Sequence, residues 1–168
     1  MIGSDKIAVI TASYGLIEKL HFLTDSARRF GIDVKIWGQH PWRGWFHSHL
    51  DSLIELKRLR GEGFTHFLYT DGIDCFFLAG LSEILSKYEQ MGEPSWLISG
   101  EMNCWPLSEL AGAPVFSCSS PYKYPNGGGN MGEIDYVLTS WELLKQLYQH
   151  RSASLIQSDD LLFLTVRI

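Results

Sequence analysis

Cysteine is scarce in this chain of 168 residues, and long apolar runs are missing from it. The three cysteines, Cys75, Cys104 and Cys118, form no C-x-x-C pair, which argues against both a disulfide framework and a structural zinc site. Apolar stretches such as Cys75–Leu81 are far too short to cross a bilayer. A formal net charge of -5 argues against a protein that binds nucleic acid through a basic surface. The composition leaves room for a small anionic ligand held by a metal.

The rest of the composition is that of a globular protein, with 45% hydrophobic and 20% charged residues. This length predicts one domain over residues 1–168, and no linker or repeat divides the sequence. A strand pattern begins almost at once, with no signal-peptide pattern before it. We therefore expect a cytoplasmic protein without a membrane span.

The first seventy residues alternate between strand and helix patterns. Lys6–Ala12 is a β-rich apolar run of the kind found in buried parallel strands. Apolar residues then recur at helical spacing from Leu16 to Phe30. Two more strand patterns, Asp33–Trp37 and Thr65–Thr70, enclose a helical pattern over 50–56. This alternation predicts an α/β fold in which helices cover a parallel sheet.

The second half of the chain is less regular. Pro, Gly and Ser abound over Asn103–Asn130, so we expect loops there. Thr139-x-x-Glu142 has the form of a capping box that starts a helix. The other elements expected are a helix over Leu81–Tyr88, a strand over Trp96–Ser99, a strand over Gly132–Leu138 and a last helix from Asp159.

Two carboxylates, Asp71 and Asp74, follow the predicted strand Thr65–Thr70. The carboxyl ends of strands are where open α/β sheets bind ligands. Gly72 between them permits backbone angles that a side chain forbids, which would let both carboxylates turn toward one point. Such hard oxygen ligands suit Mg²⁺ or Mn²⁺, which bridge diphosphates. The alternative is a plain strand-ending turn, for which Asp-Gly is a common signal.

Three further segments are candidates for function. The triple glycine 127–129 matches neither a P-loop nor a Rossmann fingerprint, and indicates either a close approach to the backbone or a flexible loop. The aromatic run Trp42–Phe46 would stack on a base or sugar, or form a hydrophobic flap; His47 and His49 alone are too few for zinc. Asp159 and Asp160 would favour a helix N-terminus without any further role.

Taken together, these pieces resemble the glycosyltransferase domain of procollagen lysyl hydroxylases and the related procollagen galactosyltransferases. The match runs in order over most of the chain. Its most specific element is the segment from Ser99 to Pro106, which is similar to that family's S-A-E-x-x-C-W-P. The matching segments are Trp42-Arg43-Gly44, Phe67-Leu68-Tyr69-Thr70-Asp71-x-x-Asp74, Ser99-Gly100-Glu101-x-x-Cys104-Trp105-Pro106, Tyr124-x-Asn126-Gly127-Gly128-x-x-x-Gly132 and Asp159-Asp160.

The resemblance implies a GT-A-like three-layer α/β/α sandwich with a mostly parallel central sheet. It also implies a UDP-sugar donor, a hydroxyl-bearing acceptor and a divalent cation, Mn²⁺ or Mg²⁺. By this resemblance Asp71 and Asp74 hold the metal, and Trp42 packs near the uridine. The remaining donor-binding residues are Tyr69, Asn126, Gly127 and Gly128, and the residues expected around the transferred sugar and acceptor are Glu101, Trp105, Asp159 and Asp160.

The chain departs from the family pattern at three points. Leu161 replaces the usual glutamine after the aspartate pair, and Gly127 replaces a serine. The family's late histidine ligand has no counterpart after Asp160, so we expect a domain without its C-terminal part. The leading hypothesis is a metal-dependent hexosyltransferase. The alternative is a degenerate domain that binds a nucleotide sugar without turnover.

Overall fold

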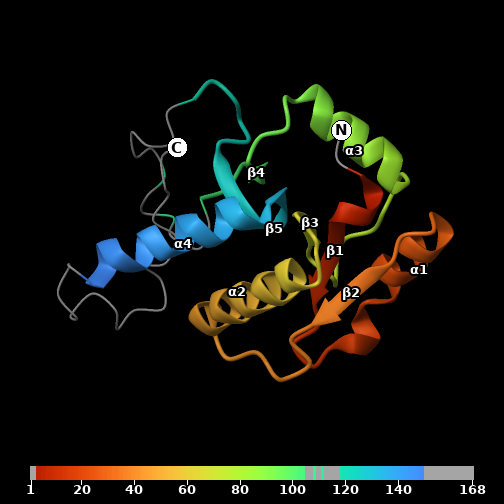
Figure 1. Cartoon of the computed structure of the whole chain (residues 1–168), viewed down its shortest axis with the longest axis horizontal. Helices are drawn as coiled ribbons and strands as arrows, with labels where there is room; N and C mark the ends of the chain where they lie inside the picture. Colours follow the sequence, from red (N-terminus) through yellow and green to blue (C-terminus); the bar gives the residue numbers. More distant parts are fainter. Residues whose placement is uncertain (1–2, 105–107, 109–110, 112–117, 150–168) are drawn as a thin grey trace.

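The computed structural model describes residues 3–104, 108, 111 and 118–149. Five strands and four α-helices form its framework (Figure 1). In chain order these are β1 (Ile7–Ala12), α1 (His21–Arg29), β2 (Val34–Trp37), α2 (Trp45–Gly61), β3 (His66–Thr70), α3 (Leu81–Gln90), β4 (Trp96–Glu101), β5 (Tyr124–Glu133) and α4 (Ile134–Gln149). Short 3₁₀ turns, η1 (Ser4–Lys6) and η2 (Ile17–Lys19), precede β1 and α1.

The strands form one sheet in the order β2-β1-β3-β5-β4. β1 pairs in parallel with both β2 and β3, whereas β5 runs antiparallel to both of its neighbours, β3 and β4. Two of the four strand pairs are thus parallel and two antiparallel, so the sheet is mixed. The predicted parallel arrangement holds for the three strands that come first in the sequence.

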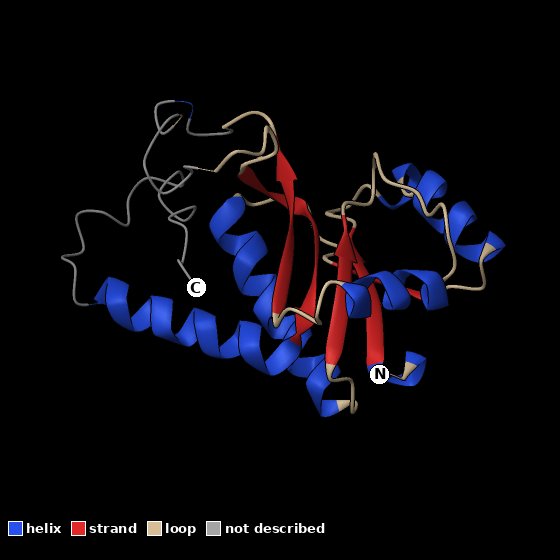
Figure 2. Ribbon diagram, turned by 90° about the horizontal axis from the view of Figure 1, so that it is seen from above, coloured by secondary structure: helices blue, strands red, loops and turns tan. Residues whose placement is uncertain are grey.

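Helices cover both faces of the sheet, which gives three layers (Figure 2). All six residues of β1 are buried, and they alternate between the faces. Ala8, Ile10 and Ala12 pack against α2 and α4 through Leu59 and residues around it. Val9 packs on the other face, against α1 and the start of α3. A strand buried on both sides explains the continuous apolar run in the sequence. The α/β class and the GT-A-like sandwich are confirmed.

The region expected to be loop and then strand is organised differently. The strand β5 spans Tyr124–Glu133, and α4 follows it directly at Ile134. The expected strand over Gly132–Leu138 is therefore wrong from Ile134 onward, where α4 begins. The loop expected over Asn103–Asn130 is wrong for Tyr124 to Asn130, which belong to β5. Thr139 lies inside α4, where its hydroxyl donates to the Asp135 carbonyl at 2.8 Å, so it does not start the helix as a capping box. The predicted segment from Asp159 lies outside the described residues.

The glycines of β5 made this strand hard to predict from the sequence, because glycine is disfavoured in strands unless another backbone comes close. At Gly132, a Cβ atom would collide with the Ser95 carbonyl oxygen and lie 2.9 Å from Trp96 Cα, both backbone atoms of the β4 side. Gly132 pairs with Trp96 across the β4–β5 ladder. The missing side chain is thus a condition for this pairing.

Among the described residues, no helix has the length and apolar character needed to cross a membrane.

Replacing Gly132 by alanine should destabilise the fold by about 1–3 kcal/mol, the usual cost of forcing an extra methyl group into a packed site. Gly127→Ala is the matched control, because it lies on the same strand and an added Cβ meets nothing within 4 Å. Thermal unfolding of both variants checks this expectation. Equal melting temperatures for the two would contradict the packing role of Gly132.

Candidate functional site

Four strands end and a fifth begins at the sheet edge that carries the candidate residues. Because β1, β2 and β3 are parallel, the segments that follow them, including Asp71 after β3, emerge together. β5 runs the other way, so its first half begins at this same edge, and β4 ends there. The register pairs Thr70 with Gly129, Ser99 with Asn126 and Glu101 with Tyr124.

Asp71 is fixed beside β5 by its own backbone. Its amide donates to the Gly128 carbonyl oxygen at 2.6 Å. Partial burial of the carboxyl, and then the negative charge of Asp74, raise the pKa of Asp71, while hydrogen bonds from the amides of Ile73 and Gly72 lower it. The two carboxylates are therefore close enough to repel each other, which is the condition that a divalent cation relieves.

The described residues supply a pair of carboxylates for a metal and no larger set. Among them, no group of three or more His, Cys, Asp and Glu side chains could hold an ion. Mg²⁺ and similar hard cations keep several waters or substrate oxygens and are often bound through one or two carboxylates. Asp71 and Asp74 fit that requirement. Within the described part of the chain, His47 and His49 belong to no such group.

Gly72 is required by space and does not adopt the left-handed conformation. An added Cβ would collide with Leu20 Cδ2 and lie 2.8 Å from the Thr11 hydroxyl oxygen. Our expectation that unusual backbone angles at Gly72 turn the carboxylates was therefore wrong. The glycine instead lets the turn after β3 sit directly on β1 and the segment before α1.

The triple glycine belongs to β5, so the flexible-loop alternative is wrong. The Asn126 side-chain oxygen accepts a hydrogen bond from the Gly128 amide at 2.7 Å. A Cβ on Gly128 would lie 2.9 Å from that oxygen and 3.5 Å from Asp71 Cβ. A close approach to the backbone at Gly128 is thus confirmed, with Asp71 and Asn126 as the neighbours. Gly127 has open space around its Cα.

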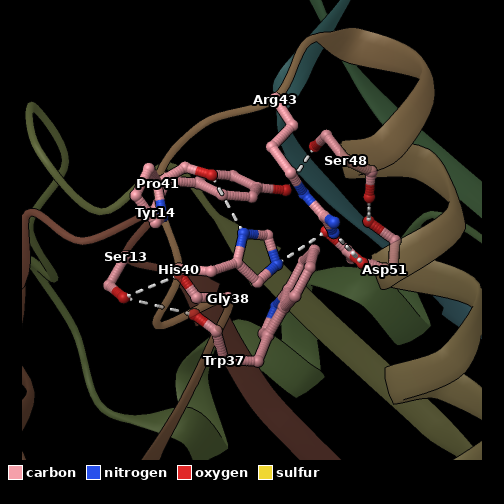
Figure 3. A network of polar contacts seen from close by, with 10 residues as sticks. Ser13, Tyr14, Trp37, Gly38, His40, Pro41, Arg43, Ser48 and Asp51 are labelled. Carbon is pink, nitrogen blue, oxygen red and sulfur yellow. Dashed lines mark hydrogen bonds and ion pairs between the residues drawn. The ribbon is translucent and has the colours of Figure 1, made fainter.

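Trp42 belongs to an aromatic group centred on Tyr14, whose ring lies beside that of His40 (Figure 3). The Trp42 ring meets Tyr14 edge-on with centroids 4.8 Å apart. Tyr14 also meets Trp37 edge-on at 5.8 Å and lies 5.9 Å from the His40 ring. Trp42 is 45% exposed, so it is not a core residue. Tyr69, on β3, packs against the core of the same face, and burial raises the pKa of its hydroxyl.

A polar network fixes the segment that carries Trp42. The Asp51 carboxylate of α2 lies 3.0 Å from His40 Nε2 and 3.5 Å from Arg43 Nη2. The Tyr14 hydroxyl hydrogen-bonds Ser48 one turn earlier on α2. Sequence reasoning missed Tyr14, His40 and Asp51, because their contacts join three separate elements and leave no local pattern. A helix beginning at Trp45, five residues before the predicted periodic run, makes these contacts possible.

The remaining expected residues divide into two groups. Glu101 ends β4 at the same edge and is half-buried. Trp105, Asp159 and Asp160 lie outside the described residues. Of the expected site residues, Gly128 contacts two others: its carbonyl oxygen accepts from the Asp71 amide, and its own amide donates to the Asn126 side chain.

Replacing Asp74 by Asn should lower the pKa of Asp71, because it removes a neighbouring negative charge. The value should stay above the ordinary one, since burial remains. Carbon NMR titration of the Asp71 carboxyl measures the change. Asp135→Asn is the control, because Asp135 pairs with Arg60 and follows the end of β5 at the opposite edge. An unchanged pKa in Asp74→Asn would show that the carboxylates do not interact.

Asp71→Asn should leave the melting temperature at neutral pH no lower than that of the parent. A raised pKa means that the folded state favours the protonated carboxyl, and this stabilisation is lost as the pH rises through that pKa. An amide never ionises, so the variant avoids the loss. A marked drop in stability would contradict this assignment.

Comparison with known proteins agrees with the resemblance found in the sequence. A family model described as PLOD GT domain matches residues 3–167. Procollagen-lysine,2-oxoglutarate 5-dioxygenase 2 of Mus musculus is 28% identical over 155 residues, and the Homo sapiens protein of the same name is also 28% identical. Each alignment covers 84% of this chain and 21% of the relative, so the chain spans about a fifth of their length. The chain belongs to the PLOD GT domain family, a family of glycosyltransferase domains.

Proposed function

We propose that this protein is a metal-dependent glycosyltransferase that moves a hexose from a UDP-sugar to a hydroxyl acceptor. The observation that carries the proposal is the meeting of Asp71 and Asp74 with the glycine-rich start of β5 at one sheet edge. Membership of a glycosyltransferase family supports it. The donor, the metal and the sugar are the parts that the proposal adds.

In this proposal Asp71 and Asp74 hold Mn²⁺ or Mg²⁺. A cation there supplies positive charge that offsets the negative charge developing on departing UDP. Asp71 needs no large movement to serve as a ligand, because its backbone is fixed to Gly128. The pKa of Asp71 is raised, so on acidification a proton competes with the metal ion for this carboxylate.

The chain's other residues orient the donor and the acceptor. Trp42 stacks on the uracil ring, and its 45% exposure leaves part of the side chain at the surface. The open space at Gly127 lets the diphosphate or the sugar approach β5, and Gly128 holds Asp71 and Asn126 next to that position. Glu101 contacts the sugar or the acceptor. A carboxylate of the Asp159–Asp160 pair accepts the proton of the acceptor hydroxyl or orients the sugar.

The direct test is release of UDP from a panel of UDP-sugars, with and without Mn²⁺. We expect Mn²⁺-dependent release from at least one UDP-hexose, and its loss in Asp71→Asn and Asp74→Asn. Asp25→Asn is the matched control, because it removes an exposed carboxylate paired with Arg28 at 2.8 Å on α1. Release that persists without metal, or in both variants, would contradict the proposal.

Calorimetry separates transfer from mere binding. Mn²⁺-dependent UDP binding, without release from any UDP-sugar, would replace transfer by the alternative of a domain that binds a nucleotide sugar without turnover. Unchanged UDP affinity in Asp71→Asn and Asp74→Asn would remove the metal assignment itself.

Trp42→Ala should weaken UDP binding by roughly ten- to hundredfold, because stacking of a base on an aromatic ring contributes about 1–3 kcal/mol. Stability should change little, because Trp42 is 45% exposed. Phe22→Ala is the control, an exposed aromatic residue on α1. A large fall in melting temperature with unchanged UDP affinity would instead make Trp42 a structural residue.

A further inference from the structure

We propose that Asp51 is a positioning residue that holds Trp42 ready for the nucleotide base. The inference rests on the proposed function, in which Trp42 stacks on uracil. Asp51 itself lies on α2 and does not contact the base in this account. Its carboxylate acts through the two side chains that flank Pro41-Trp42.

The two oxygens of Asp51 face two residues of one short segment (Figure 3). Oδ2 lies 3.0 Å from His40 Nε2, and Oδ1 lies 3.5 Å from Arg43 Nη2. The Asp51 side chain is only 16% exposed, so these contacts are less screened by water than surface ion pairs. One carboxylate thus holds both ends of the His40–Arg43 segment.

His40 extends the contact to the main chain beside Trp42. Its Nδ1 atom lies 3.0 Å from the Pro41 carbonyl oxygen. The His40 ring thus lies between the Asp51 carboxylate, on its Nε2 side, and the Pro41 carbonyl oxygen, on its Nδ1 side. The peptide that leads into Trp42 is thereby linked to α2.

The same helix also fixes the ring on which Trp42 rests. The Tyr14 hydroxyl hydrogen-bonds Ser48, and Ser48 precedes Asp51 by three residues, so both lie on one face of α2. Tyr14 has a φ of 44°, a strained conformation for a bulky residue, and its ring meets Trp42 edge-on. Two neighbouring positions of α2 therefore determine where the Trp42 ring stands.

This arrangement matters because Trp42 is nearly half exposed. Burial alone holds such a side chain weakly, and ordering a mobile one on binding weakens affinity. A segment held in place beforehand avoids that loss. Removing the negative charge of Asp51 should therefore weaken UDP binding by about two- to tenfold, with the whole loss passing through Trp42.

A double-mutant cycle on Mn²⁺–UDP affinity tests the proposal by calorimetry. The proteins are the parent, Asp51→Asn, Trp42→Ala and the double variant. We expect Asp51→Asn to weaken binding in the parent and to have no effect once Trp42 is absent. Equal losses in both backgrounds, or no loss in either, would overturn the positioning role.

Controls keep the result separate from stability and from the proposed function. Glu55→Gln breaks an Arg58 pair one turn along α2 and should leave UDP affinity unchanged. If Asp51→Asn unfolds, Arg43→Gln replaces it, because Arg43 is 52% exposed and contributes little to stability. It should also lose affinity only when Trp42 is present. Unchanged UDP affinity in Trp42→Ala would overturn both the stacking role and this inference. If Trp42→Ala weakens UDP binding but Asp51→Asn and Arg43→Gln do not, only this inference is overturned.

Discussion

The Asp71 amide donates a hydrogen bond of 2.6 Å to the Gly128 carbonyl oxygen at the point where β3 ends and β5 runs alongside it. The rest of the site depends on this antiparallel pairing. It reverses the direction of the chain, so the start of β5 and the end of β4 reach the edge where the parallel strands end. The neighbouring pairing of β5 with β4 demands glycine at Gly132, where a Cβ atom would meet the backbone of Ser95 and Trp96. The glycine at this position thus has a cause in packing, whereas an added Cβ at Gly127 would meet nothing within 4 Å.

Two structural units meet at this edge, and they are built by different parts of the chain. The carboxylates and the glycine-rich strand come from β3 and β5, whereas the aromatic group comes from the segments after β1 and β2 together with α2. Tyr69 links the two units. Its ring packs against the same core cluster as Tyr14 and Trp37, and the charges of Asp71 and Tyr14 both add to the burial that raises the pKa of its hydroxyl. In the proposed function the first unit serves the metal, diphosphate and sugar, and the second serves the base.

The sequence predicted the elements that rest on strong apolar patterns. β1 was expected over Lys6–Ala12 and spans Ile7–Ala12, and the sheet-edge rule correctly placed Asp71 at the end of β3. β5 was missed because the glycine at position 132 is explained only by its contacts with Ser95 and Trp96, which lie elsewhere in the sequence. The Asp51 network was missed for a similar reason: ion pairs from a helix to a preceding segment leave no periodic signal. Local patterns thus gave the framework, while tertiary contacts decided the details of the site.

The most direct test of the central claim is a crystal structure of the protein with Mn²⁺ and UDP, with the metal located by its anomalous scattering. The account predicts one Mn²⁺ peak within direct coordination distance of the Asp71 and Asp74 carboxylates, bridged to the diphosphate, with the uracil ring on Trp42. A metal peak elsewhere, or UDP bound away from the edge where β3 ends and β5 begins, would contradict it.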